Sequence, residues 1–265
     1  MFLNSCDFNP FYSEDKVSSI RRGEYISRMH DEKVMIPLQE KRELRPYPWK
    51  YLTIGNYPKI TKEHFRCKGC DRNPDKYIEQ GNGLVLVKDC GGIEQHSLPL
   101  RENKEFIYPI LIHLLNYVQL KAQKPVVITS GHRCPDHNRY NDPLPKSQFS
   151  KHMVGGEVSF YVKGLEEEPE KVIALLQEYF QENEEYQGQP EYLTFKRWER
   201  SNTDVSTQPW YNKEVFIKLY KAAEGRNFDN SHSYPYIAIQ VRYDRALKEN
   251  VSYSWDKAFR TYWRW

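Results

Sequence analysis

The apolar residues of this chain are gathered into short, separate runs, and the spacing within each run limits the elements that the chain can form. Between residues 106 and 118 they recur every three or four positions, which is the repeat of a helix with one apolar stripe. The same repeat predicts a second helix over residues 168–179. We expect a third, shorter helix over residues 212–220.

Four other runs have the length and composition of strands. One is rich in β-branched residues, two alternate apolar and polar positions, and one follows a Gly-Asn-Gly turn signal; they cover residues 125–129, 157–162, 236–242 and 83–87. These strands and helices follow one another without a regular strand–helix–strand repeat. The order favours an α+β fold over a doubly wound sheet.

The organisation of the chain changes near residue 60. Residues 1–60 are polar and irregular, with charges of both signs and helix-breaking Pro46 and Pro48, and we predict an N-terminal extension there. A single main domain would follow, from residue 61 to residue 265. Within it, residues 130–149 are predicted to form a long polar loop, a length that is often functional. The aromatic and basic tail, residues 255–265, is expected to dock on the domain.

The charge balance and the distribution of apolar residues exclude two classes of function. Lys and Arg number 39 against 36 Asp and Glu, a net charge of +3, so we expect no nucleic-acid partner. No apolar run approaches the ~18 residues of a membrane span. The N-terminus lacks the basic and apolar regions of a signal peptide, which makes the cytoplasm the default expectation. A processed chain would instead belong to the periplasm or the cell envelope.

Two segments carry residues suited to chemistry. The first, ITSGHRCPDHN over residues 128–138, is a strand that ends in a Ser-Gly turn and presents Arg133, whose guanidinium can pair with a carboxylate or a phosphate. The second, SKHMVGGEVS over residues 150–159, places His152 before a glycine turn and Glu157 on the strand that follows. A histidine and a carboxylate in this arrangement can supply half of a metal site.

Together the two segments resemble the zinc D-alanyl-D-alanine carboxypeptidases and endopeptidases, whose fold is shared with the Hedgehog signalling domain. The family pattern is S-G-x-R, then S-x-H-x-x-G-x-A-x-D, and near the end a strand with x-H-x-D. The matching residues here are Ser130, Gly131, Arg133, Ser150, His152 and Gly155. Over residues 65–245 the resemblance implies an antiparallel sheet flanked by helices. It also implies a peptide or peptidoglycan-derived ligand, bound by Arg133, Ser130 and His152.

The resemblance implies a catalytic zinc as well, but only one of its three expected ligands, His152, is present in register. The family aspartate falls on Ser159, the last zinc histidine on Ala238 and the neighbouring acid on Gln240. Alanine cannot bind a metal, and a neutral serine is a poor ligand. Substitute ligands beside His152 are available in the sequence: Glu157, His232, and, in the long loop, His132 or His137.

A separate cysteine segment, residues 64–96, contains a CxxC pair, and one further cysteine lies beside Arg133. Four thiolate or imidazole groups close a tetrahedral structural zinc site. One candidate set is Cys67, Cys70, Cys90 and His96, and the other replaces His96 with Cys134. A disulfide in an exported protein and unpaired buried thiols are the competing interpretations.

Three hypotheses of function follow from these motifs. In the first, the chain is a degenerate peptidase-like domain, a pseudoenzyme that binds a peptide carboxyl terminus, such as that of the peptidoglycan stem. In the second, it is an active zinc metallopeptidase with substitute ligands. In the third, it is a structural or interaction protein with a structural zinc site. The sequence leaves the oligomeric state open.

Overall fold

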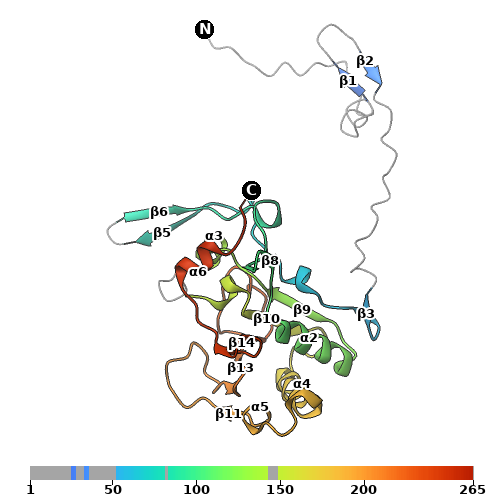
Figure 1. The fold of residues 1–265 in the computed structure, drawn as a ribbon. Coiled ribbons are helices and arrows are strands. Elements are labelled where there is room, and N and C mark those ends of the chain that lie inside the picture. The colour runs from blue at the N-terminus through green and yellow to red at the C-terminus, as the bar shows by residue number, and fades with distance from the viewer. Residues whose placement is uncertain (1–24, 28–32, 36–51, 81–82, 143–148, 265) are drawn as a thin grey trace. The chain divides into compact units, whose positions relative to one another are not determined.

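The computed structural model describes residues 25–27, 33–35, 52–80, 83–142 and 149–264 (Figure 1). The chain divides into two units, Met1–Tyr47 and Pro48–Trp265. In the first unit the described residues form one antiparallel hairpin, β1 (Tyr25–Ser27) with β2 (Lys33–Met35). The sequence predicts that the main domain begins at residue 61, but the second unit already begins at Pro48. Ile60 belongs to the core of this unit.

A six-stranded antiparallel sheet forms the centre of the second unit. Its strand order is β11-β12-β13-β14-β10-β9. The strands are β9 (Val126–Ser130), β10 (Glu157–Val162), β11 (Lys196–Arg197), β12 (Trp210–Tyr211), β13 (Val215–Tyr220) and β14 (Tyr236–Val241). The α+β class, with an antiparallel sheet and flanking helices, is confirmed.

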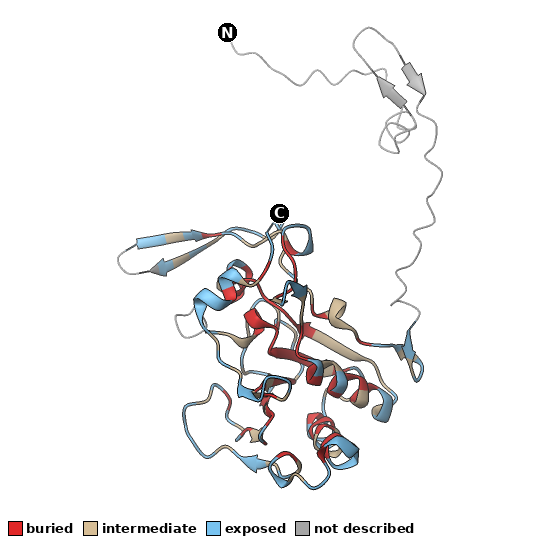
Figure 2. Ribbon diagram, viewed as in Figure 1, coloured by how far each residue is buried: buried red, intermediate tan, exposed pale blue. Residues whose placement is uncertain are grey.

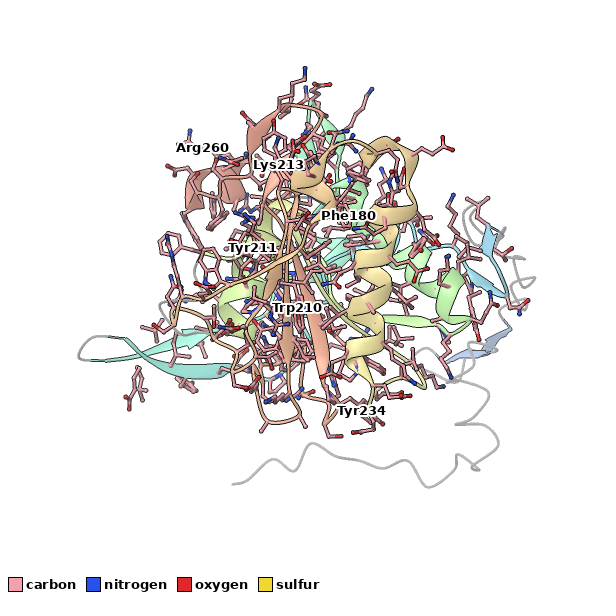
Figure 3. All side chains as sticks on the ribbon, turned by 90° about the horizontal axis from the view of Figure 1, so that it is seen from below. Phe180, Trp210, Tyr211, Lys213, Tyr234 and Arg260 are labelled. Atoms are coloured by element: carbon pink, nitrogen blue, oxygen red, sulfur yellow. The ribbon has the colours of Figure 1, made fainter. Side chains whose placement is uncertain are left out.

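Two long helices, α2 (Pro109–Ala122) and α4 (Pro169–Glu182), pack against each other and against the sheet (Figures 1 and 3). Both begin with proline at the first helical position, where no amide donor is needed. Their apolar stripes and the inward side chains of the central strands form the main core, shown in red in Figure 2. Fully buried members include Leu111, Leu114, Leu176, Phe160 and Ile239.

The remaining elements are short and surround this core. Four antiparallel hairpins are formed by β3 (Thr53–Ile54) with β4 (Tyr57–Pro58), β5 (Lys76–Gln80) with β6 (Gly83–Val87), β7 (Leu100–Arg101) with β8 (Lys104–Glu105), and β15 (Tyr243–Asp244) with β16 (Glu249–Asn250). The short α-helices are α3 (Pro135–Asn141), α5 (Pro190–Leu193) and α6 (Trp255–Arg260). Single 3-10 turns are η2 (Lys62–Phe65), η3 (Gly92–Glu94), η5 (Lys151–Val154) and η6 (Glu184–Tyr186).

The predicted helix over residues 212–220 is wrong, because most of this run forms strand β13. Val215, Ile217 and Leu219 face the core at every second position, which is the repeat of a strand. The side chains between them are also largely covered, so the run lacks the polar alternation that would have indicated a strand. The side chain of Asn212 accepts hydrogen bonds from the amides of Glu214 and Val215 and fixes the turn before β13.

The predicted loop over residues 130–149 is wrong in part. Residues 135–141 form helix α3, which starts with Pro135 after Cys134, whose thiol accepts a hydrogen bond from the His137 amide. Residues 143–148 lie outside the described residues.

At the C-terminus, Ala258 and Tyr262 are buried, so the expected docking of the tail is confirmed. None of the helices in the described ranges has the length and apolar character that crossing a bilayer would require.

Glu214, in the turn between β12 and β13, makes the stability of this fold depend on pH. Its side chain is buried, and Oε2 has no hydrogen-bond partner among the described residues. Burial raises the pKa of Glu214 from 4.5 to about 7. A raised pKa stabilises the folded state below pH 4.5, and this contribution disappears as the pH rises through 7.

We predict that Glu214→Gln removes a pH-dependent loss of stability of roughly 2–3 kcal/mol between these two pH values. The measurement is the free energy of unfolding by urea at each pH. Glu184→Gln, at an exposed position of η6, is the control and is expected to keep the wild-type slope. An unchanged slope in Glu214→Gln would contradict the assignment.

Candidate functional site

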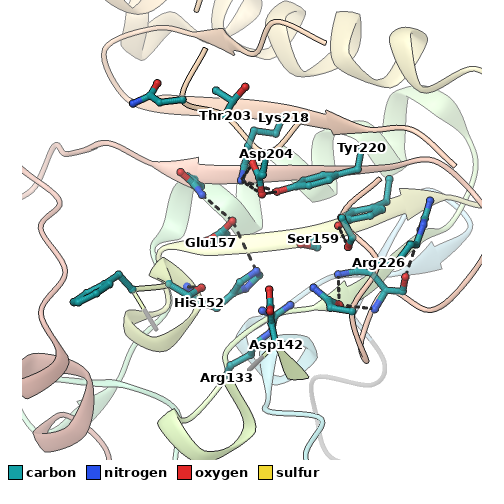
Figure 4. A pocket seen from close by; sticks show the side chains of 18 residues that line it. Arg133, Asp142, His152, Glu157, Ser159, Thr203, Asp204, Lys218, Tyr220 and Arg226 are labelled. Atoms are coloured by element: carbon teal, nitrogen blue, oxygen red, sulfur yellow. Dashed lines mark hydrogen bonds and ion pairs between the residues drawn. The ribbon is translucent and has the colours of Figure 1, made fainter. Parts of the chain in front are cut away.

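A polar pocket of about 630 Å³ lies on the face of the sheet that α2 and α4 do not cover (Figure 4). Side chains alternate along β10, so Val158 and Phe160 enter the helix-covered core while Glu157 and Ser159 line the pocket. Lys218, Tyr236 and Gln240 come from β13 and β14, and Arg226 comes from the loop between them. Arg133 follows β9, and His152 lies in η5.

Small side chains occupy neighbouring positions on β10 and β14. Ser159 on β10 is the cross-strand partner of Ala238 on β14, and Ala238 is in turn the partner of Lys218 on β13. The two positions to which the resemblance assigns zinc ligands, Ser159 and Ala238, are therefore neighbours in the sheet. Neither supplies a metal-binding group of the kind that zinc prefers.

Arg133 is held at one end of this pocket by its Nε alone. Nε donates to Ser130 Oγ at 2.7 Å and to Asp229 Oδ2 at 2.9 Å, and Arg133 is only 5% exposed. Its two terminal nitrogens have no hydrogen-bond partner among the described residues, and Arg133 lines the pocket. Gly131 allows the turn before Arg133 to pack against the Phe65 backbone, where a Cβ would lie 2.6 Å from the Phe65 Cα.

Asp229 connects Arg133 to a buried histidine. Besides Arg133, it accepts a hydrogen bond from Ser130 Oγ at 2.7 Å, and its Oδ1 lies 3.0 Å from His137 Nε2. The other ring nitrogen of His137 lies 2.7 Å from Asp89 Oδ1. Burial lowers the pKa of His137, but the hydrogen bonds to Asp229 and Asp89 outweigh it and raise the pKa to about 9. Burial opposes ionisation of Asp229, yet His137 and Arg133 hold its pKa well below the ordinary value.

His152 and Glu157 face each other across the pocket floor (Figure 4). His152 Nε2 lies 3.9 Å from Glu157 Oε1, and Gln240 Nε2 donates to the same carboxylate oxygen at 2.9 Å. Beside them Lys218 Nζ donates to Asp204 at 3.1 Å and to the Tyr220 hydroxyl at 2.6 Å. Three carboxylates line the pocket, those of Asp142, Asp204 and Glu157. Asp204 is paired with a lysine, whereas Glu157 has an amide and an imidazole as its neighbours.

The predicted catalytic-metal residues are only partly brought together. His152 and Glu157 are neighbours, whereas His232 does not line the pocket and packs against Tyr161, with ring centroids 5.2 Å apart. His132 is also buried elsewhere, with its ring 5.8 Å from that of His96. Among the described residues, no group of three His, Cys, Asp or Glu ligand atoms includes His152.

The cysteine segment forms a second, separate cluster. Ligand atoms of Cys67, Cys90, His96 and Cys134 all lie within 4.8 Å of one another. Cys70 is not part of this group: its amide is bonded to Asp89, and its thiol lies near Asp71. The structure therefore includes both His96 and Cys134, which the sequence offered as alternatives, and leaves out the second cysteine of the CxxC pair.

The distances in this cluster suit a tetrahedral zinc ion better than a disulfide. Cys67 Sγ and Cys90 Sγ are 3.7 Å apart, and Cys90 Sγ lies 3.5 Å from His96 Nε2. Ligands at zinc-bond lengths would be separated by ~3.8 Å between two sulfurs and ~3.6 Å between sulfur and nitrogen. His96 Nδ1 is 3.0 Å from the carbonyl of Ser97, which fixes the proton there and leaves Nε2 free to bind a metal. The group can hold a metal such as zinc.

Two residues of the site were missed by sequence reasoning. Asp229 and Asp89 are 92 and 48 positions from the histidine that they both contact, so no local spacing connects them. Asp229 lies in the loop between β13 and β14, and Asp89 follows β6. The one available signal was the polar composition of these loops, which does not identify a particular carboxylate.

Comparisons with known proteins add no relative: no family model matches the chain, and neither a curated protein nor a solved structure matches it significantly.

We predict that Asp229→Asn lowers the free energy of unfolding by about 3–5 kcal/mol, because it leaves the buried Arg133 without its counter-charge. Urea denaturation measures the change. The control is Asp75→Asn, which makes the same substitution in an exposed ion pair with Lys88 and should cost less than about 1 kcal/mol. Equal effects in the two variants would show that Asp229 does not hold the site together.

Proposed function

We propose that the pocket binds the carboxyl terminus of a peptide and does not hydrolyse it. The observation that carries this proposal is the state of Arg133. Its Nε is fixed by Ser130 and Asp229, while its terminal nitrogens have no partner among the described residues and line the pocket. A guanidinium oriented in this way can donate two parallel hydrogen bonds to a carboxylate.

A contrast within the same pocket supports this role. Arg226 also lines the pocket, but its nitrogens donate to backbone carbonyls, including those of Ala222 and His232. These hydrogen bonds stabilise the loop between β13 and β14. The pocket has room for a short peptide, since small-molecule sites typically measure ~300–1,000 Å³. The resemblance to the D-alanyl-D-alanine peptidases makes a peptidoglycan stem peptide the first ligand to test.

We infer that the pocket does not hydrolyse the peptide, because its described residues lack the side chains that would hold a catalytic zinc. A zinc-activated water needs about three protein ligands to hold the metal and a carboxylate to move the proton. Ser159 and Ala238 take the positions of two implied ligands, and among the described residues no three ligand atoms that lie within 4.8 Å of one another include His152 or Glu157.

Binding of free D-alanyl-D-alanine and of its C-terminal carboxamide, measured by calorimetry, tests the proposal. We expect the acid to bind, the carboxamide to bind at least about tenfold more weakly, and Arg133→Lys to lose about the same, because lysine cannot make the paired contact. Arg197→Lys, on β11 outside the pocket, is the control. Equal binding of acid and carboxamide, or release of free D-alanine from the dipeptide, would overturn it.

We also propose that the cluster of Cys67, Cys90, Cys134 and His96 holds a structural zinc ion. Support comes from the separations of its ligand atoms and from the hydrogen bond that orients His96. The ion would join three stretches of chain: the segment after η2, the segment around η3 and the start of α3. When four protein ligands fill a tetrahedral site, no position remains for a catalytic water.

The two neighbouring cysteines of the CxxC pair make a matched test of this site. We predict one zinc per chain in the wild type and in Cys70→Ser, and loss of zinc in Cys67→Ser. The melting temperature of Cys67→Ser should fall by about 6–12 °C, since a loss of ~3 kcal/mol shifts a domain of this size by ~2–4 °C per kcal/mol. Metal analysis with thermal unfolding measures both. Loss of zinc from Cys70→Ser would contradict the assigned ligand set.

A further inference from the structure

The facing groups of His152 and Glu157 are both hydrogen-bond acceptors. His152 Nδ1 lies 2.6 Å from the carbonyl oxygen of Gly131, which can only accept, so this nitrogen carries the proton. A neutral imidazole protonated at Nδ1 has a lone pair at Nε2. Burial and the charge of Arg133 lower the pKa of His152 to about 4, which agrees with a neutral ring. An imidazole lone pair therefore points toward a carboxylate oxygen 3.9 Å away, with no donor between them among the described residues.

Glu157 has no lysine or arginine in direct contact with its carboxylate among the described residues. The residue is 6% exposed, and its one hydrogen bond from a described side chain comes from the neutral amide of Gln240. The nearest lysine in the pocket, Lys218, already donates to Asp204 and Tyr220. Burial opposes ionisation of Glu157, but nearby charges, those of Lys218 and Arg133 among them, hold its pKa below the ordinary value. Neither side chain donates to the carboxylate, so the acceptor position that faces His152 is open to a cationic group from outside.

An ammonium group fits this place better than a metal ion. One nitrogen can lie about 2.9 Å from both acceptors when they are 3.9 Å apart, and an ammonium has three protons to donate. A metal ion would have only two protein ligands, fewer than catalytic or structural zinc sites use.

We propose that His152 and Glu157 bind a primary ammonium group of the same ligand whose carboxylate Arg133 binds. The ligand class is then a zwitterionic peptide with a free amine as well as a free carboxyl terminus. This inference rests on the proposed function, because it takes Arg133 as the carboxylate site. Figure 4 shows the two groups lining one pocket, with Glu157 between His152 and the cluster of Lys218, Asp204 and Tyr220.

The test compares D-alanyl-D-alanine with N-acetyl-D-alanyl-D-alanine by calorimetry, which changes the amine and leaves the carboxylate intact. We expect acetylation to weaken binding to the wild type by about tenfold or more, the effect of losing a charge-assisted hydrogen bond. Glu157→Gln should remove this difference, since the glutamine keeps the shape and loses the charge. Asp204→Asn, which changes the lysine-paired carboxylate, should retain it.

The outcomes separate this inference from the proposed function. Equal binding of the free and acetylated dipeptides, with both still sensitive to Arg133→Lys, overturns the ammonium site and leaves the carboxylate site standing. Failure of both dipeptides to bind overturns the two together. A metal ion that is lost in Glu157→Gln would also overturn the inference. The acetylation comparison uses the wild-type protein alone, so it decides the question even if Glu157→Gln does not fold.

Discussion

The candidate site depends on one buried carboxylate, that of Asp229. It accepts hydrogen bonds from Ser130 and Arg133 and contacts the ring of His137, and its side chain is 3% exposed. These contacts join the loop between β13 and β14 to the end of β9 and to helix α3. Without this anion the Arg133 guanidinium would be buried without a counter-charge. With it, the Nε is fixed, and the terminal nitrogens have no partner among the described residues of the pocket.

The same contacts connect the pocket to the cysteine cluster. Cys134 directly follows Arg133 and caps α3, and Asp89, the second partner of His137, directly precedes Cys90. Gly69 allows the chain to pass over Cys90, because a Cβ at this position would lie 2.1 Å from its sulfur. Binding of zinc would therefore fix two of the segments that position Arg133. In this account the metal has a structural role, and the ligand is recognised by charges in the pocket.

The sequence predicted the helices and strands whose signal lies within their own segment of the chain. Helices α2 and α4 and strands β6, β9, β10 and β14 were expected close to their observed bounds, because each has an apolar repeat, a β-branched run or a turn signal in its own segment. Strand β13 was not, since both of its faces are covered and the alternation is hidden. The segments with Arg133 and His152 were recognised from their residue types, and the structure brings both to one pocket.

What the sequence could not predict depends on contacts between distant positions. Asp229 lies 96 residues from Arg133, so only the folded chain reveals it as the anchor. The CxxC spacing favoured Cys70 as a zinc ligand. In the structure its backbone is bonded to Asp89, and its side chain lies outside the cluster that Cys134 completes. A motif of local spacing identified the right segment here, but the ligand set was fixed by the packing of three segments.

The most direct test of the account is an anomalous-scattering map, recorded at the zinc edge from crystals of the purified protein. The account predicts one peak, about 2.3 Å from the sulfurs of Cys67, Cys90 and Cys134 and bound also by His96, with no peak in the pocket. A metal ion on His152 and Glu157 would contradict it, because the pocket would then contain a metal centre where we infer a site for a charged peptide.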